Sequence, residues 1–216
     1  MFPIVWARLN RTFEGSLVRL EPLQPEHGDA LYEASRDPRI WTWLGTLEWG
    51  SFAPDREAFD AWFNHALREI AATNAVVFAI ADRRSDRVVG STRFMYLRPR
   101  HKALSIAWTW LSPSVWGSGM NVESKLLMLE HAFERVECRR VEFLADARNE
   151  RGCRVLAALP AHLDGVLRRH MQLVDGERDS ACFSIIGDDW PSVRANLEQR
   201  LGLAAPGARQ SAEPPG

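Results

Sequence analysis

Ser112-Pro-Ser-Val-Trp-Gly-Ser-Gly-Met-Asn121 is the stretch of sequence that decides the fold. The residues before it, 103–111, are apolar almost throughout, as is typical of a strand near the middle of a sheet. The residues after it place apolar side chains at spacings of four, three, four and three, at Val122, Leu126, Leu129, Phe133 and Val136. This spacing predicts a helix with one buried stripe. The stretch therefore joins a predicted central strand directly to a predicted amphipathic helix.

The quoted stretch has the features of an anion-binding loop. The first N–H groups of a helix have no partners within the helix and lie at the positive end of its dipole, so they attract phosphate. Gly117 and Gly119 remove side chains that would keep a phosphate away from the backbone. Asn121 is expected to cap the helix, and Lys125, one turn further on, to add a cationic contact. The alternative is a tight turn in which the glycines serve backbone geometry alone.

Several other kinds of site are not indicated by the sequence. No GxGxxG follows a strand, and neither GxxxxGK[ST] nor GxSxG occurs. The three cysteines, Cys138, Cys153 and Cys182, are widely spaced and form no CxxC pair. Neither a disulfide framework nor a zinc site fits that pattern, so the cysteines are expected to serve packing and no metal is predicted.

The overall composition argues against two classes of partner. The 216 residues carry a formal net charge of −1, which gives no global field to recruit nucleic acid or an anionic membrane. No apolar run approaches the roughly 20 residues that a transmembrane helix needs. The first residues lack the basic segment and the apolar run of a signal peptide. A cytoplasmic protein is expected.

Outward from the loop, the chain alternates strand and helix patterns. Alternation over 16–23 predicts a strand with Val18 and Leu20 on one face and Arg19 and Glu21 on the other. Further strands are predicted at 75–82, 87–96 and 140–146 and on both sides of Asp175-Gly176, and helices at 25–35, 59–70, 149–159 and 190–201. Residues 1–203 are expected to form a single α/β domain. Residues 204–216, rich in Ala, Pro and Gly, are expected to form a disordered tail.

The segment Trp116-Gly-Ser-Gly-Met-Asn-Val-Glu-Ser-Lys-Leu-Leu-Met-Leu-Glu-His-Ala-Phe133 resembles the central motif of the GNAT N-acyltransferase superfamily. It is most similar to the RimJ/RimL-like branch, which acetylates protein N-termini and other amines. Further segments that resemble the family stand in its order along the chain, over about residues 14–200: Val18-Arg-Leu-Glu-Pro-Leu23, Gly90-Ser-Thr-Arg-Phe94, Trp108-Thr-Trp-Leu111, Arg148-Asn-Glu-Arg151 and Gly165-Val-Leu-Arg168. The resemblance implies the GNAT fold. That fold is a mixed, mostly antiparallel sheet of six or seven strands flanked by helices, with strands four and five splayed.

The resemblance also implies acetyl-CoA as co-substrate. In the family the pantetheine arm inserts between the splayed strands, so its amides are expected to bind the backbone of Trp108, Thr109, Trp110 and Leu111. The backbone of Trp110 is the candidate group for polarising the thioester carbonyl. The pyrophosphate is expected on the N–H groups of Trp116, Gly117, Ser118, Gly119, Met120 and Asn121. The amine then attacks the thioester directly, and catalysis rests on positioning and carbonyl polarisation.

Some positions that carry functional groups in relatives hold other residues here. Relatives often have Glu at the place of Ser105, Ser at that of Gly152 and Tyr near Leu156. Their basic or polar residue before the first glycine falls on Ser114, and their usual Leu-Gly is Leu159-Pro160. An α-amine titrates at about 7.7–8.0 and a lysine amine near 10.4, so the α-amine depends less on a dedicated base. These differences favour an α-amine acceptor.

Three polar residues are candidates with a structural alternative each. Glu21, on the polar face of its strand, could take a proton through water, or form a surface ion pair with Arg19 or a neighbour. Arg93 lies in an otherwise apolar strand and could bind a substrate carboxylate with two hydrogen bonds, or form a structural ion pair. Asn149 could bind CoA or the acceptor, or cap the helix that follows it.

Two further groups are candidates for the acceptor site. His170 and Asp179 approach the hairpin that borders this site in relatives, or are solvated hairpin residues. Trp41 and Trp43, with Trp108 and Trp110, could line an acceptor or acyl pocket, or belong to the core. Of these, Trp41 and Trp43 precede a variable loop and are expected to be the less buried.

The predicted activity is acetyl transfer from acetyl-CoA to a primary amine, on a protein or peptide N-terminus or on a small molecule. Two alternatives stay open. One is a catalytically weak acyl-CoA-binding protein that senses or regulates, and the other is a loop that binds nothing. The acceptor is the expected partner. Dimers are common among similar proteins, which leaves a homodimer open as well.

Overall fold

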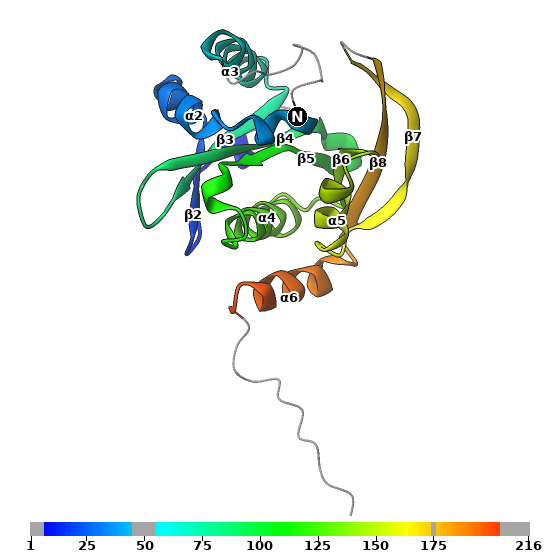
Figure 1. The fold of residues 1–216 in the computed structure, drawn as a ribbon. Helices are drawn as coiled ribbons and strands as arrows, with labels where there is room; N and C mark the ends of the chain where they lie inside the picture. Colours follow the sequence, from blue (N-terminus) through cyan, green and yellow to red (C-terminus); the bar gives the residue numbers. More distant parts are fainter. Residues whose placement is uncertain (1–6, 45–54, 174–175, 204–216) are drawn as a thin grey trace, which may run out of the picture.

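An eight-stranded mixed sheet forms the centre of the molecule (Figure 1). Its strand order is β1-β2-β3-β4-β5-β6-β8-β7, and the only parallel pair between described strands is β5 with β6. The strands are β1 Phe13–Glu14, β2 Val18–Pro22, β3 Ala75–Asp82, β4 Val88–Arg98, β5 Ala103–Leu111, β6 Arg140–Asp146, β7 His162–Leu173 and β8 Gly176–Ile186. The computed structural model describes residues 7–44, 55–173 and 176–203.

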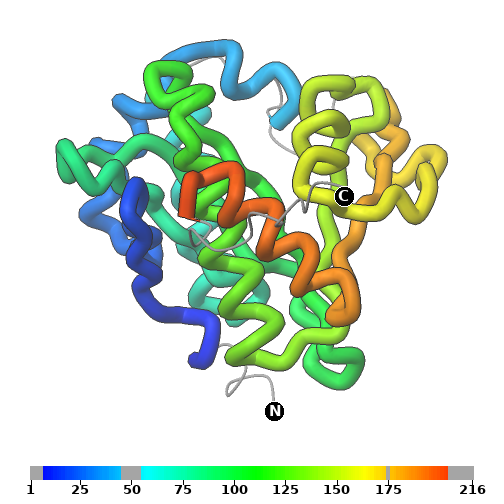
Figure 2. The backbone as a smooth tube through the Cα atoms, turned by 90° about the horizontal axis from the view of Figure 1, so that it is seen from below, coloured from blue at the N-terminus to red at the C-terminus, as the bar shows by residue number. Residues whose placement is uncertain are grey.

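Helices cover both faces of this sheet. On one face lie α2 (Gly28–Ser35) and α3 (Arg56–Ala71), and on the other α4 (Met120–Glu130) and α6 (Trp190–Arg200), as Figure 1 shows. Figure 2 shows α6 crossing over α4. The fifth helix, α5 (Glu150–Ala157), packs against β6 and β8. Short helical turns lie at Pro25–His27, Pro38–Trp43, Pro99–His101 and Pro113–Val115, and a wide turn, His131–Arg135, ends α4.

The mixed, mostly antiparallel sheet implied by the family resemblance is confirmed, with one strand more than expected. The extra strand, β1, is two residues long, too short to show a periodic pattern. The strand predicted at 87–96 extends to Arg98. The predicted hairpin strands are present, but Asp175 of their turn lies outside the described residues. The tail predicted at 204–216 also lies outside them, and the single domain over 1–203 stays a prediction.

The start and the burial of α4 differ from the sequence prediction. The helix begins at Met120, and the residue before it, Gly119, has a φ of +88°. Asn121 is therefore inside the first turn and does not cap the helix, which corrects the prediction. Of the predicted stripe, Leu126, Leu129 and Phe133 are buried, while Val122 and Val136 are only half-buried. Other sides of α4 are buried too, because β1, β2 and α6 contact it away from the sheet.

Glu123 on α4 holds the N-terminal segment against the sheet. This carboxylate is buried, and it accepts hydrogen bonds from the backbone N–H groups of Ser16 (2.8 Å), Leu17 (2.7 Å) and Val18 (2.7 Å). Hydrogen bonds to a charged acceptor are stronger than neutral ones, and three of them compensate for burying the charge. The contact fixes the entrance to β2 against the helix that begins at the glycine loop.

Candidate active site

The central feature of the candidate site is a gap between β5 and β6. The two strands pair only at Ala103 with Arg140, Leu104 with Val141 and Ser105 with Glu142. Beyond Ser105, β5 continues to Leu111 and β6 continues to Asp146, but the two strands no longer pair with each other. The splay expected from the family is therefore present. It leaves one edge of β5, from residue 106 onward, with backbone groups that no neighbouring strand uses.

A β-bulge in β5 accompanies the splay. Ser91 of β4 pairs with Trp110 and Arg93 with Ala107, so two residues of β5 oppose the single residue Thr92. Within the bulge, Trp108 has a φ of +51°. A bulge bends its strand and increases the local twist. The bulge lies in the part of β5 that does not pair with β6, and within the Trp108–Leu111 segment that resembles the family.

The glycine loop follows at the end of β5. Gly117 and Gly119 have φ values of +77° and +88°, a region that glycine enters without steric cost. Within the described residues, no hydrogen-bond partner is found for the backbone N–H groups of Gly117, Gly119, Asn121 and Val122. Those of Trp116 and Ser118 bond to the carbonyls of Pro113 and Val115, and that of Met120 to Ser118 Oγ. As far as the described part of the chain goes, the loop thus offers four donors without a partner at a helix N-terminus, which suits an anion.

Trp116 stiffens the loop and brings two arginines to it. Its Nε1 donates to the Leu111 carbonyl (2.8 Å) at the end of β5. The guanidinium of Arg151 on α5 lies 3.9 Å from the centre of the Trp116 ring, and that of Arg39 lies 5.4 Å from it. Neither arginine was predicted as a site residue. Arg151 lies in a quoted motif, but nothing in the sequence brings Arg39, which precedes Trp116 by 77 positions, close to its ring.

Lys125 does not lie at the loop. It is buried, and its Nζ donates to Thr109 Oγ1 on β5, which in turn bonds to Thr92 Oγ1 (2.7 Å) on β4. Burial lowers the pKa of Lys125 to about 7. The expected contact between Lys125 and a phosphate does not fit this arrangement, because the side chain turns from the helix toward the sheet.

The Arg93 side chain lies among aromatic rings, on the face of the sheet opposite to Lys125. Its guanidinium lies 5.0 Å from the centre of the Trp108 ring and 5.8 Å from that of Trp62. The residue is only 2% exposed, and no hydrogen-bond partner for its Nε or Nη2 exists among the described residues. Burial lowers the pKa of Arg93 to about 10. The structural ion pair considered for it is not formed with any described side chain.

The predicted tryptophan pocket is only partly realised. Trp41 is buried, its Nε1 donates to the Ser35 carbonyl (2.8 Å), and its ring packs against Trp62 and Trp110. It is a core residue and not an exposed one, which corrects the expectation. Trp43 is 36% exposed, with the Arg148 guanidinium 5.9 Å from its ring centre. The side chain of Trp110 is buried as well, so its expected role rests on its backbone.

Glu21 is far from the gap and forms the ion pair that was its alternative. Its Oε1 accepts from Arg19 Nε, and its Oε2 lies 2.9 Å from His27 Nε2. Burial raises the pKa of Glu21, but the hydrogen bonds from His27 and Arg19 outweigh it and leave the pKa below its ordinary value. Glu21 is on β2, three strands from β5, or roughly 14 Å at ordinary strand spacing. A base role at the gap does not fit this position.

At the positions where relatives carry proton-transfer groups, this chain has no comparable side chain. Asn149 caps α5, its Oδ1 accepting from the Gly152 N–H (2.8 Å), as its alternative anticipated. A Cβ at Gly152 would lie 2.6 Å from Asn149 Nδ2, so a serine would require Asn149 to move. Ser105 Oγ is buried without a partner among the described residues, and Leu156 packs against the core.

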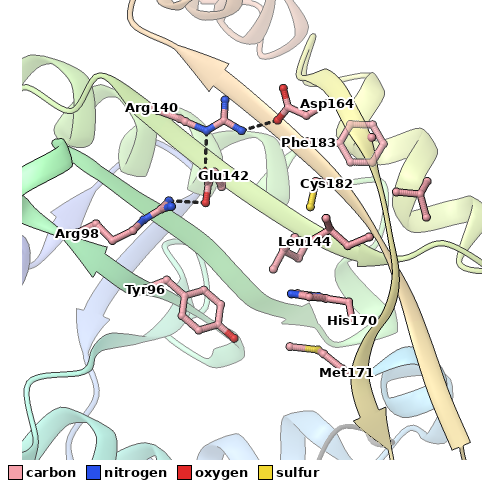
Figure 3. A pocket seen from close by; sticks show the side chains of 13 residues that line it. Tyr96, Arg98, Arg140, Glu142, Leu144, Asp164, His170, Met171, Cys182 and Phe183 are labelled. Atoms are coloured by element: carbon pink, nitrogen blue, oxygen red, sulfur yellow. Dashed lines mark hydrogen bonds and ion pairs between the residues drawn. The ribbon is translucent and has the colours of Figure 1, made fainter.

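His170 and Asp179 lie on the hairpin of β7 and β8 but have different surroundings. His170 lines a cavity of about 800 Å³ together with Tyr96, Leu144 and Met171 (Figure 3). Its Nδ1 lies 3.0 Å from Ser180 Oγ. Asp179 Oδ1 accepts from the Arg169 N–H (2.6 Å) and borders a second cavity of about 1000 Å³, which His170 also lines.

Charged side chains at one end of the first cavity pair with one another (Figure 3). Glu142 accepts from Arg140 Nε (2.7 Å) and from Arg98, and Arg140 also donates to Asp164. Among the described residues, no group of three or more His, Cys, Asp or Glu side chains could hold a metal ion. No described helix is long and apolar enough to span a membrane.

Comparisons with known proteins agree with this geometry. Residues 18–161 match the family model described as an acetyltransferase (GNAT) domain. A solved structure of a candidate acetyltransferase from T. thermophilus is 38% identical over 88% of this chain and 97% of that chain, with a TM-score of 0.77. A GCN5-related N-acetyltransferase from Brucella melitensis is 26% identical over 88% of this chain and 85% of that chain, with a TM-score of 0.80.

A more distant solved structure shares the fold alone. The ribosomal-protein-S5-alanine acetyltransferase from Vibrio fischeri is 18% identical over 83% of this chain and 98% of that chain, with a TM-score of 0.64. No curated protein matches the sequence.

Proposed function

This chain belongs to the acetyltransferase (GNAT) family, and from that premise we propose that it moves the acetyl group of acetyl-CoA to the α-amine of a peptide N-terminus or of a small molecule. The observation that carries the proposal is the gap between β5 and β6 beyond Ser105, with the glycine loop at its end. An extended ligand rich in amides fits the unpaired edge of β5, because that edge offers alternating N–H and C=O groups.

The residues at the two ends of the gap suit the two ends of acetyl-CoA. The N–H groups of Gly117, Gly119, Asn121 and Val122, which bond to no described residue, suit a pyrophosphate, with Arg39 and Arg151 adding positive charge beside them. Before the loop, the backbone of Trp108 to Leu111 suits the thioester end. Donors held by a bulged strand need no rearrangement when charge develops on the carbonyl oxygen, which is the main source of rate in this kind of transfer.

Glu21 and the positions at which relatives carry proton-transfer groups favour an α-amine over a lysine side chain. Glu21 is remote and paired, and Ser105, Gly152 and Leu156 bring no strong proton acceptor to the gap. An amine with a pKa of about 7.7–8.0 is neutral often enough at pH 7 to react with modest help, whereas one near 10.4 is not.

Arg93 supports an acceptor that also carries a carboxylate. A guanidinium that is 2% exposed and whose Nε and Nη2 lack hydrogen-bond partners among the described residues is costly to bury. It lies beside Trp108, on the strand that borders β5. A carboxylate can satisfy its donors in pairs. An amino acid, or a peptide with an acidic residue near its N-terminus, fits this requirement.

The test is an acceptor panel with release of free CoA thiol as the readout. The panel pairs peptides that have a free α-amine with the same peptides blocked at the N-terminus and containing lysine. It also pairs amino acids with their carboxamides. We expect thiol release with free α-amines, little with the blocked peptides, and higher kcat/KM for carboxylates than for carboxamides. Thiol release that requires lysine and ignores the α-amine would contradict the proposal.

The differences at Ser105, Gly152 and Leu156 support a second candidate, a catalytically weak protein that binds acyl-CoA in order to sense or regulate. Calorimetric titration with acetyl-CoA separates the two. Tight binding without thiol release from any amine favours the sensor, and thiol release that depends on the acceptor favours the enzyme.

A further inference from the structure

The cavity of about 800 Å³ lies beside the point where β5 and β6 separate. On β6, Val141 and Phe143 point into the core under α4, so Glu142 and Leu144 point to the opposite face. Both line the cavity, and Glu142 belongs to the last pair of residues that joins the two strands. The cavity therefore borders the gap on the face of the sheet away from α4.

His170 enters this cavity from the hairpin with one ring nitrogen anchored. Its Nδ1 lies 3.0 Å from the Oγ of Ser180, which is fully buried on β8. When Nδ1 carries the proton and donates to Ser180, Nε2 keeps its lone pair. Nε2 has no hydrogen-bond partner among the described residues, and the ring projects into the cavity (Figure 3). This is the arrangement of a general base.

Tyr96 faces the same cavity from the other side, at the end of β4 (Figure 3). Its backbone has a φ of +50°, which is unusual for a bulky residue and costs conformational energy. Such strain gathers at functional sites, where the surrounding structure enforces it. The bulge turns the phenol, 46% exposed, toward the cavity. Arg178 on β8 lies near enough for its charge to interact with Tyr96.

The carboxylates around His170 are engaged. Glu142 and Asp164 pair with Arg98 and Arg140, Asp146 pairs with Arg148, Glu177 pairs with Arg169, and Asp179 accepts from the Arg169 backbone. Each of these carboxylates already accepts a hydrogen bond from a guanidinium or an N–H donor. Arg178 contributes positive charge behind them.

We propose that this cavity receives the acceptor amine, that His170 Nε2 removes its proton and that the Tyr96 hydroxyl returns one to the departing thiolate. The assignment rests on the acetyl transfer proposed above. The ammonium gives one proton to His170, and the neutral nitrogen forms a bond to the thioester carbon. The C–S bond breaks, and the sulfur takes the Tyr96 proton. The nitrogen loses its second proton, which restores Tyr96, and His170 releases its proton to solvent.

The cavity also explains how the chain can be an enzyme without the usual residues of its relatives. Ser105, Gly152 and Leu156 lie on β5 and α5, whereas His170 and Tyr96 come from β7 and β4. The proton-transfer groups are thus supplied by different elements that surround the same gap.

The first test measures kcat/KM against pH for the best α-amine of the panel. For His170→Gln we expect a fall of about 100-fold at pH 7, with acetyl-CoA affinity unchanged. The remaining activity should follow the ionisation of the amine itself, near 7.7–8.0. For His170→Ala, added imidazole should restore part of the rate. The matched control is His162→Gln, an exposed histidine at the start of the same strand, which should keep the wild-type profile.

The second test concerns the proton donor and the anchor. Tyr96→Phe should lower kcat by about ten-fold or more, with a smaller change in KM, while Tyr32→Phe, at the other tyrosine of the chain, should not. Ser180→Ala should shift the acidic limb of the profile, because it frees the His170 ring. A purely structural role would not produce imidazole rescue or a changed pH profile.

The outcomes separate this assignment from the proposed function. Wild-type activity that persists in His170→Gln and Tyr96→Phe, with unchanged pH profiles, would overturn the assignment and leave acetyl transfer standing. Loss of activity in His170→Ala without rescue by imidazole, together with lost acetyl-CoA binding, would also overturn it in favour of a structural role. A wild-type protein that releases no thiol with any amine would overturn the proposed function, and this assignment with it.

Discussion

Lys125 shows how far a single residue can depart from what its position in the sequence indicates. It lies one turn into the helix that follows the glycine loop, where a cation suits a phosphate. Its direction depends on how α4 rolls against the sheet, which only the tertiary packing sets. The side chain turns inward and donates to Thr109 instead. Trp41 departs for the same reason, since its ring packs with Trp62 and Trp110, which are distant in sequence.

The pKa of Lys125 gives stability a defined dependence on pH. Burial lowers this pKa from 10.5 to about 7, so between pH 7 and 10.5 the unfolded chain binds a proton that the folded protein does not. The free energy of unfolding therefore rises with pH over this range. The cost of burying Lys125 is absent above pH 10.5 and grows as the pH falls to 7. The slope is at most roughly 1.4 kcal/mol per pH unit.

We expect Lys125→Met to remove that dependence. Urea unfolding at pH 6, 7, 8 and 9 should show the variant gaining most over the wild type at pH 6–7, with the difference shrinking toward pH 9. The control is Lys102→Met, at the other lysine of the chain, which is exposed and pairs with Glu137. A difference between Lys125→Met and the wild type that stays constant over this range would contradict the expectation.

At the scale of elements, the sequence predicted the kinds and order of strands and helices well, because their apolar periodicity is strong. The splay itself was expected only from the family resemblance. No pattern in 103–111 or 140–146 shows that pairing stops at Ser105, since both segments look like ordinary buried strands. The sequence did not predict the bulge at Trp108 either, because no sequence pattern indicates a positive φ at a tryptophan.

Glu123 connects two elements, and its loss should be costly. Glu123→Ala leaves the N–H groups of Ser16, Leu17 and Val18 without their acceptor in a buried place. Hydrogen bonds to charged groups contribute roughly 1.5–3 kcal/mol each, so we expect the free energy of unfolding to fall by about 3 kcal/mol or more. Chemical denaturation measures this. Glu130→Ala, at the last residue of the same helix, is the control, and equal losses in the two variants would contradict this role of Glu123.

Gly119 tests the glycine loop as an element. A Cβ at this position would lie 3.2 Å from Leu17 Cδ1 and would require a left-handed backbone, which costs about 1–2 kcal/mol for other residues. We expect Gly119→Ala to raise the Kd for acetyl-CoA at least ten-fold, as measured by calorimetry. Gly202→Ala at the end of α6, with a φ of +70° and nothing within 4 Å, should lose comparable stability and keep its Kd. Equal Kd values for acetyl-CoA in the two variants would contradict the role of the loop in binding phosphate.

At the scale of the whole molecule, the sheet brings together residues that the sequence holds far apart. Two guanidiniums, Arg39 and Arg151, meet at Trp116, and Tyr96 faces His170 across the cavity (Figure 3). The sequence predicted the loop and the strand next to it because both are local. Of the groups around the proposed acceptor cavity, the family resemblance singled out His170 but not Tyr96, because the approach of β4, β6 and β7 depends on the bend of the sheet and on the long hairpin.

The most direct measurement of the central claim is a crystal structure of the protein with CoA bound. We predict the pantetheine arm in the gap, bonded to the backbone of β5 between residues 106 and 111. We also predict the pyrophosphate within hydrogen-bond distance of the N–H groups of Gly117, Gly119, Asn121 and Val122. CoA bound outside the gap, or a β5 that pairs with β6 as far as Leu111 and leaves no room for a ligand, would contradict the claim.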